Sequence, residues 1–162
     1  MNIHFKAIGK ILTPFNTLEG MPIQSAAAKN VEGTIELNPL YVEGMKDLDG
    51  FSHLILIYYF HKVHEYSLQV VPFLDDQPHG IFATRFPKRP NPIGFSVVRL
   101  KSIEGNHIHV LDVDVLNETP LLDIKPYVPM FDAIETSKIG WFEKRIENVD
   151  KVDKVKADKS IY

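Results

Sequence analysis

Residues 80–101 have the sequence GIFATRFPKRPNPIGFSVVRLK, a basic segment in a chain whose formal net charge is -3. The segment holds five basic side chains and no acidic one. Each of its three prolines removes a backbone donor and keeps the preceding residue out of the helical region. It therefore predicts a stiff, extended loop at 85–94, RFPKRPNPIG, between two apolar strand-like runs, GIFAT and FSVVRL.

Two interpretations fit this loop. A solvated basic turn would need no partner. Arginines on a preorganised loop could instead bind an anion or a nucleotide, because a stiff loop has little entropy left to lose on binding. The residues of the loop by themselves leave both interpretations open.

Apolar runs with the alternation of β-strands lie on both sides of the loop. The most apolar run, FSHLILIYYFHKV at 51–63, is predicted to be a long strand buried on both faces. The segment 38–49 has a loose helical spacing that suits one or two turns. Strands are predicted at 5–12, 31–37, 51–63, 95–103, 107–116 and 121–128. This pattern predicts a mainly β fold of the small-barrel type.

The run HIHVLDVDVL at 107–116 pairs with 95–103 across a hairpin signal, Glu104-Gly105-Asn106. Strict alternation would put Asp112 and Asp114 on one face together with Ile108. The two faces are then His107, His109, Leu111, Val113 and Val115 on one side, and Ile108, Val110, Asp112, Asp114 and Leu116 on the other.

Composition narrows the class of protein. With 162 residues, 44% apolar and 24% charged, the chain fits one globular domain. It has no cysteine, which excludes disulfides, thiolate nucleophiles and Cys-ligated zinc. The first ten residues lack the apolar core of a signal peptide, and no apolar run approaches membrane-spanning length, so we expect a cytoplasmic protein without membrane contact. No glycine-rich dinucleotide loop is present, which excludes a Rossmann methyltransferase.

Histidine pairs were considered as metal ligands. His61 and His64 would point to opposite faces of a strand, whereas His107 and His109 would share one. Neither pair has an obvious third ligand, so we expect no metal site. His61, at the polar end of its strand, would ordinarily be a hydrogen-bonded structural residue.

A family resemblance rests on two segments. ATRFPKRPNPIGFSVVRL at 83–100 resembles the signature of the TsaA-like family, also called the tRNA methyltransferase O family, whose usual form is close to ATRSPxRPNPIGxSVVxL. LNETPLLDIKPYVPMFD at 116–132 is similar to the family's LDGTPLLDIKPYVPxxD. The resemblance covers the chain from residue 5 to residue 132.

The resemblance implies a small single-sheet β-barrel with few short helices, a homodimer, and S-adenosylmethionine (SAM) bound near the subunit interface. It implies a SAM-dependent methyltransferase that methylates N6 of threonylcarbamoyl-adenosine next to the tRNA anticodon. The implied cofactor-binding residues are Pro22, Ile23, Gln24, His61, Lys62, Arg85, Phe95, Asn117, Glu118, Thr119 and Pro120. The chain departs from the family pattern at three of these, Ile23 for Arg, Asn117 for Asp and Glu118 for Gly.

The remaining site residues concern the substrate. We expect Lys88, Arg89, Asn91 and Lys125 to bind it. The N6 proton is acidified by the neighbouring acyl group, so Asp123, His61 or water could remove it as a modest base. Asp123 and Lys125 fit a surface ion pair equally well.

The domain prediction divides the chain into a barrel domain at 1–135 and a charged tail at 136–162. The tail holds Ile139, Trp141, Phe142 and Ile146, which could dock a short helix. Longer family members carry an extra C-terminal domain that helps engage tRNA, and we expect this chain to be a short form without it. Two alternatives stay open: a SAM- or RNA-binding module without catalysis, and a methyltransferase for another substrate.

Overall fold

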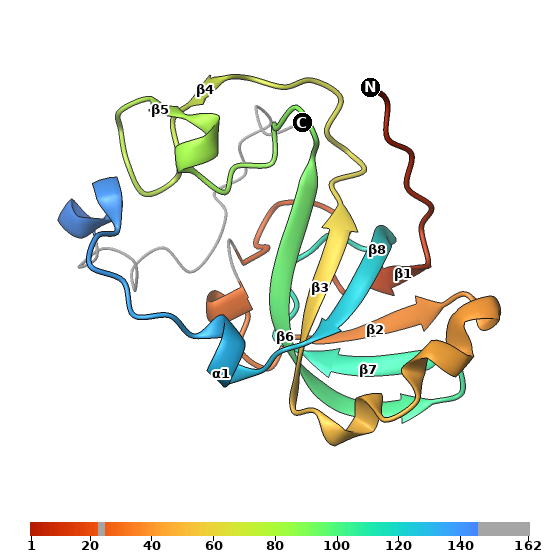
Figure 1. Ribbon diagram of the computed structural model, residues 1–162. Helices are drawn as coiled ribbons and strands as arrows, with labels where there is room; N and C mark the ends of the chain where they lie inside the picture. The colour runs from red at the N-terminus through yellow and green to blue at the C-terminus, as the bar shows by residue number, and fades with distance from the viewer. Residues whose placement is uncertain (23–24, 146–162) are drawn as a thin grey trace.

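The computed structural model describes residues 1–22 and 25–145, and its main feature is a closed antiparallel barrel (Figure 1). Strands follow one another around the barrel in the order β1-β2-β7-β6-β3-β8, and β4 pairs with β5 in a separate ribbon. The strands are β1 (Gly9–Leu12), β2 (Glu32–Leu37), β3 (His53–Tyr59), β4 (Gln69–Val70), β5 (His79–Gly80), β6 (Ile93–Glu104), β7 (His107–Leu111) and β8 (Thr119–Pro126). The predicted mainly β fold, a small single-sheet barrel, is confirmed.

Helices are few and short, as predicted. The predicted turns at 38–49 are two 3-10 helices, Pro39–Met45 and Leu48–Gly50, and the first is capped by the Asn38 side chain, which accepts a bond from the Leu40 amide at 3.0 Å. The other helices are α1 (Pro129–Asp132) and 3-10 helices at Ser25–Ala27, Ile81–Ala83 and Gly140–Lys144. Across residues 1–22 and 25–145, no helix has the length and apolar character needed to cross a membrane.

Alternating side chains of the strands fill the barrel. Leu54, Leu56 and Tyr58 of β3 are buried inside it, and Ile57 and Tyr59 point outward. The prediction that this strand is buried on both faces was wrong, because an antiparallel barrel covers only its inner face. The buried core consists of Ile11, Ile35, Leu54, Leu56, Tyr58, Val98, Ile108, Val110, Val113, Val115 and Leu121.

The run GIFAT was predicted as a strand and is instead a 3-10 helix, Ile81–Ala83. The carbonyl of Ile81 accepts from the amide of Thr84 at 3.2 Å and from its hydroxyl at 3.0 Å. Only Gly80 of this run belongs to a strand, β5, where it pairs with Gln69 of β4. The prediction of a strand over the whole run was wrong, because the local bonds of Thr84 close residues 81–84 into a turn.

The predicted strand at 107–116 ends early, at Leu111. Asp112 has a φ of 71°, a left-handed conformation that interrupts the alternation of faces. Beyond it Val113 lies in the core with Ile108 and Val110. The shared-face assignment of Asp112 and Asp114 was therefore wrong, and the two carboxylates occupy different surroundings.

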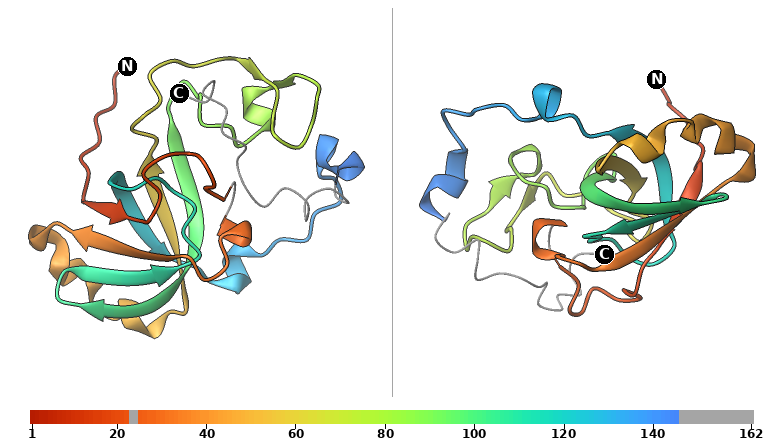
Figure 2. Two further views of the ribbon diagram at one scale, coloured as in Figure 1. Left: turned by 180° about the vertical axis from the view of Figure 1, so that it is seen from behind. Right: turned by 90° about the horizontal axis from the view of Figure 1, so that it is seen from below.

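The loops gather at one end of the barrel. In Figure 1, β4, β5 and the proline-rich loop at 84–92 lie together beyond the upper ends of β3 and β6. The 3-10 helix Gly140–Lys144 lies beside the β4–β5 ribbon in both views of Figure 2, and the Trp141 indole donates to the carbonyl of Ala83 at 2.8 Å. This end of the barrel carries the candidate site.

Candidate functional site

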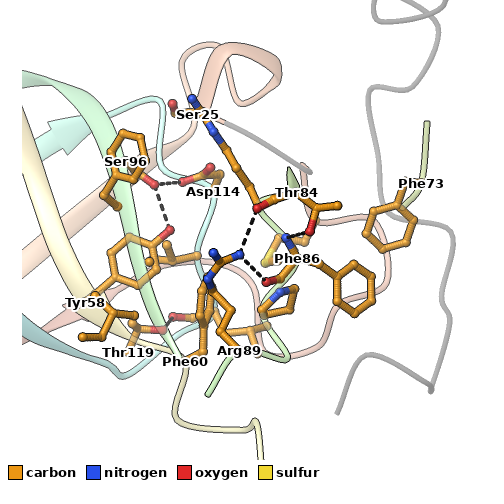
Figure 3. A pocket seen from close by; sticks show the side chains of 18 of the residues that line it. Ser25, Tyr58, Phe60, Phe73, Thr84, Phe86, Arg89, Ser96, Asp114 and Thr119 are labelled. Carbon is orange, nitrogen blue, oxygen red and sulfur yellow. Dashed lines mark hydrogen bonds between the residues drawn. The ribbon is translucent and has the colours of Figure 1, made fainter. Parts of the chain in front are cut away.

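A cavity of about 490 Å³ opens between the barrel end, the proline-rich loop and the segment 140–145 (Figure 3). Its size lies within the range of small-molecule sites, roughly 300–1,000 Å³. Aromatic side chains supply much of its wall: Tyr58, Phe60, Phe73, Phe86, Phe95, Trp141 and Phe142. The cavity therefore suits a ligand with a flat apolar part.

The loop holds its shape through Arg89. The Nη1 atom of Arg89 donates to the carbonyls of Ile81 at 3.1 Å, Thr84 at 2.9 Å and Phe86 at 3.4 Å, and Figure 3 shows its side chain directed at the last two residues. The Thr84 hydroxyl accepts from the amide of Phe86 at 3.3 Å. Arg89, predicted to bind substrate, also lines the cavity, but these bonds engage one end of its guanidinium with the loop.

Arg85 is presented differently. Its side chain is exposed, and its guanidinium carbon lies 5.0 Å from the centre of the Phe95 ring. Both residues line the cavity. Among residues 1–22 and 25–145, no ion pair involves Arg85. A guanidinium stacked on a ring keeps its N–H edge available for a carboxylate or phosphate.

Two of the five charges in the basic segment are neutralised locally. Arg99 pairs with Asp112 through an Nη2–Oδ1 bond of 2.9 Å, and Lys101 pairs with Glu32 at 2.6 Å. These partners lower the pKa of both carboxyl groups. The basic segment therefore contributes the guanidinium groups of Arg85 and Arg89 to the cavity wall, whereas Lys88 lies on the same loop outside that wall.

His61 and Lys62 follow directly after β3 and both line the cavity. The neighbouring Phe60 amide donates to the carbonyl of Pro92 at 2.8 Å, which ties the strand end to the loop. Burial lowers the pKa of His61, and Lys62 lowers it further, against the opposing effect of Glu118. The imidazole is therefore neutral at pH 7 and able to accept a proton.

The predicted turn at 117–120 is only partly at the cavity. Thr119 is buried and lines it, and its hydroxyl donates to the carbonyl of Leu116 at 2.7 Å. Asn117 instead stabilises the turn after β1, accepting from the Thr13 amide at 3.1 Å and donating to Asn16 Oδ1 at 3.1 Å.

Among the described residues of the predicted cofactor set, Pro22, Glu118 and Pro120 do not line the cavity. Glu118 stands where the family has glycine and adopts a φ of 61°, a conformation that costs glycine less. Pro120 pairs with Lys10 in the β1–β8 ladder, and Pro22 is buried. The predicted contacts of Ile23 and Gln24 lie outside the described residues.

Three polar side chains of the cavity wall were missed by the sequence analysis. Tyr58, Ser96 and Asp114 form a hydrogen-bonded chain, with 3.0 Å between the Tyr58 and Ser96 hydroxyl oxygens and 2.5 Å between Ser96 Oγ and Asp114 Oδ1 (Figure 3). Burial raises the pKa of Asp114 to about 6, although the Ser96 hydrogen bond and nearby Arg85 act in the opposite direction. Burial and the Asp114 charge also raise the pKa of Tyr58.

Family membership follows from a comparison with known families. The model of the tRNA-methyltransferase O N-terminal domain matches residues 10–133. The chain belongs to this family.

Relatives and solved structures agree with this membership. A probable S-adenosyl-L-methionine-binding protein of Pyrococcus abyssi is 52% identical over 156 residues, which is 96% of this chain and 83% of that protein. The human tRNA (adenine(37)-N6)-methyltransferase is 32% identical over 82% of this chain, which spans 32% of the human enzyme. The crystal structure of TrmO from Pseudomonas aeruginosa superimposes with a TM-score of 0.73 at 36% identity, covering 87% of this chain and 63% of that one.

Asp123, Lys125 and Asn91 of the predicted family site do not line the cavity. Asp123 and Lys125 form an ion pair of 2.6 Å on β8, with side chains 44% and 57% exposed. This geometry is the surface ion pair that was the alternative to a role for Asp123 and Lys125 at the substrate. Asn91 is exposed, and its carbonyl accepts from the amide of Ile93 at 2.8 Å.

The segment 140–145 closes one side of the family cavity. Trp141 stacks on His79 with ring centres 4.6 Å apart and on Phe142 at 3.9 Å. Arg145 pairs with Asp75 at 2.7 Å. No group of three potential metal ligands gathers within residues 1–22 and 25–145. The predicted contribution of Ile146 lies outside the described residues.

Proposed function

We propose that this protein binds SAM in the cavity and transfers its methyl group to N6 of threonylcarbamoyl-adenosine beside the tRNA anticodon. The observation that carries the proposal is that five of the predicted cofactor-binding residues line one cavity: His61, Lys62, Arg85, Phe95 and Thr119. The names of the Pyrococcus and human relatives, a probable SAM-binding protein and a tRNA (adenine(37)-N6)-methyltransferase, support it.

The residues at the cavity fit the chemical groups of SAM. Arg85, which forms no ion pair within the described part of the chain, offers its guanidinium edge for the carboxylate, and the aromatic wall offers faces for the adenine. When bound, SAM supplies an electrophilic methyl group. The protein's contribution is to hold the acceptor nitrogen in line with that methyl group and to exclude water.

The tRNA would be bound by the positive end of the barrel. Lys88 lies on the rigid loop without an ion pair among residues 1–22 and 25–145, so it is suited to a backbone phosphate. We place the protein in the cytoplasm and divide the chain into a barrel domain at 1–135 and a C-terminal segment at 136–162, whose Trp141 and Phe142 contribute to the cavity wall.

Lys88→Ala is expected to weaken tRNA binding and to make it less salt-dependent. Each phosphate contact releases counterions, so losing one lowers the slope of log K against log salt by roughly 0.7–0.9. The measurement is fluorescence anisotropy with labelled tRNA over a salt series. Lys101→Ala is the matched control, because Lys101 is paired with Glu32 at 2.6 Å and should leave the slope unchanged. Equal slopes for wild type and Lys88→Ala would contradict the phosphate contact.

The outer face of β3 and β6 supports a homodimer. Tyr59 and Ile93 lie opposite each other and are 39% and 36% exposed, and neighbouring Phe95 is 51% exposed. Asp123 and Lys125 pair with Ile57 and Ile55, whose side chains point outward from β3. In a dimer, these two residues could therefore contribute only to the cavity of the second copy.

Light scattering should therefore return about twice the 18.5 kDa chain mass. Tyr59→Lys should return the mass of one chain, because a lysine on an apolar interface would be buried without a partner. A wild-type mass of 18.5 kDa at every concentration tested would contradict the dimer.

A SAM-binding module without catalysis is the second candidate. The name of the Pyrococcus relative, which mentions binding only, favours it. The test that separates the two is transfer of labelled methyl from SAM to bulk tRNA. Saturable SAM binding without any transfer would favour the module.

A further inference from the structure

The chain of hydroxyl groups on the cavity wall ends at a carboxylate. Ser96 is 4% exposed and has a single hydroxyl proton, which it donates to Asp114 over 2.5 Å. The Tyr58 hydroxyl, 3.0 Å from Ser96, must therefore donate to Ser96. Two aligned O–H dipoles thus point toward Asp114, and they fix the orientation of its carboxyl group at the cavity.

Asp112, two residues earlier, provides an internal comparison. Its carboxylate is bound by Arg99 and accepts from the amide of Asn30 at 2.7 Å, and these bonds lower its pKa. Asp114 forms no ion pair within the described part of the chain. Two carboxyl groups of one short segment therefore have opposite shifts, a separation typical of one structural and one reactive acid.

We propose that Asp114, held by Ser96 and Tyr58, is the general base that removes the N6 proton of the acceptor adenine. The inference rests on the proposed methyl transfer and assigns a catalytic residue to it. Neither the family signature nor the predicted site contained this residue.

The reaction balances without another reagent. The N6 lone pair forms the new N–CH₃ bond, while the bond between methyl and sulfur breaks and its electrons stay on sulfur as a neutral thioether. The N–H bond breaks, and its proton passes to a carboxylate oxygen of Asp114. The carboxyl group then returns the proton to water.

The surroundings of Asp114 set its proton affinity. The groups that face it are the Ser96 hydroxyl from β6, Tyr58 from β3, Arg85 from the loop, and the backbone amide of Ser25. Burial raises the pKa of Asp114 to about 6, which brings the carboxylate closer to the basicity that suits catalysis near neutral pH. The base must be ionised, so the rate should rise with pH through about 6 and level off above it.

Asp114→Asn is the direct test. Asparagine has the same shape and can still accept from Ser96, but its amide cannot take up a proton. We expect kcat to fall by about 100-fold or more, because general bases contribute roughly 10²–10⁴-fold. The affinity for SAM should change by less than about threefold, and the rise of rate with pH should disappear from the residual activity. Asp114→Glu should restore part of kcat.

Two comparisons separate this role from a structural one. Asp112→Asn, the matched control, should lower the melting temperature and keep the rise of rate with pH. Asp114→Asn should keep the melting temperature and lose the rise of rate with pH. Because burial raises the pKa of Asp114, the folded state binds this proton more tightly than the unfolded state, and wild type loses stability as pH rises from about 4 to 6. Asparagine does not titrate, so the stability of Asp114→Asn should not fall over this pH range. The variant should melt no lower than wild type at pH 7.5.

Each other outcome counts against the inference. A kcat within about tenfold of wild type, or an unchanged rise of rate with pH, would rule out Asp114 as the base. Loss of the rise in His61→Gln but not in Asp114→Asn would assign the base to His61. SAM affinity reduced more than about tenfold would assign Asp114 to cofactor binding. A wild type that binds SAM but methylates no tRNA would overturn the proposed function as well, whereas an active Asp114→Asn beside an active wild type would overturn this inference alone.

Discussion

Gly94→Ala is expected to destabilise the protein and to suppress methyl transfer, although the change adds one methyl group. A Cβ at Gly94 would lie 2.7 Å from Phe60 Cζ and closer still to the Tyr58 ring. These rings pack edge to face with centres 5.4 Å apart, and Tyr58 is 4% exposed and bonded to Ser96. A shift of the Tyr58 ring would disturb its hydrogen bond with Ser96, and with it the chain of hydroxyl groups that ends at Asp114.

The expected cost of this overpacking is about 1–3 kcal/mol. For a protein of this size each kcal/mol lowers the melting temperature by about 2–4 °C. Calorimetry and a methyl-transfer assay would measure both effects. Gly44→Ala is the control, since no atom that would contact its added Cβ lies within 4 Å among residues 1–22 and 25–145. If Gly94→Ala melted and reacted like Gly44→Ala, the packing of Tyr58 against Gly94 would not matter to the site.

Arg85→Ala and Arg89→Ala are expected to impair SAM binding for different reasons. Arg85 is exposed and engages the Phe95 ring, so its loss should leave the melting temperature unchanged. It should weaken SAM binding by about tenfold or more, because a charge-assisted hydrogen bond contributes about 1.5–3 kcal/mol.

Arg89→Ala should be the more damaging change. It removes the donor that joins the carbonyls of Ile81, Thr84 and Phe86, so the loop loses its internal support. We expect a lower melting temperature together with about a 100-fold loss of SAM affinity, because an unsupported loop must be ordered on binding. Arg89→Lys should rescue little, since a lysine ammonium cannot reproduce the planar donor set of arginine.

Titration calorimetry and thermal melting together test this pair. We expect SAM affinity and melting temperature to fall together in Arg89→Ala, and SAM affinity alone to fall in Arg85→Ala. If Arg85→Ala melted early while Arg89→Ala melted normally, the assignment of the two arginines would have to be exchanged.

The barrel could be predicted because its signals are local. Alternation in β2, β6 and β8 appears directly in the sequence, and Gly105 supplies the turn between β6 and β7 with a φ of 61°. The errors occurred where side chains redirect the backbone. Thr84 closes a 3-10 turn onto Ile81, and Asp112 adopts a left-handed conformation, and neither effect follows from hydrophobic periodicity.

The sequence predicted only those residues of the candidate site that lie within one continuous motif. Arg85 and Phe95 belong to one signature, and the Arg85 guanidinium stacks over the Phe95 ring at the cavity. Asp114 depends on the turn at Asp112 and on its contact with Ser96, 18 residues away in the sequence. No single-segment pattern contains that contact, whereas Asp123 is an acid within a motif and was therefore the carboxylate predicted from the sequence.

The most direct test of the proposed function identifies the methylated nucleoside. Transfer RNA from cells that lack the family's activity would be incubated with SAM and the purified protein, digested to nucleosides and analysed by mass spectrometry. The account predicts that N6-methylated threonylcarbamoyl-adenosine appears with the wild type and is strongly reduced with Asp114→Asn. If that nucleoside never appears with the wild type, while a control enzyme of the family produces it from the same tRNA, the proposed methyl acceptor is wrong.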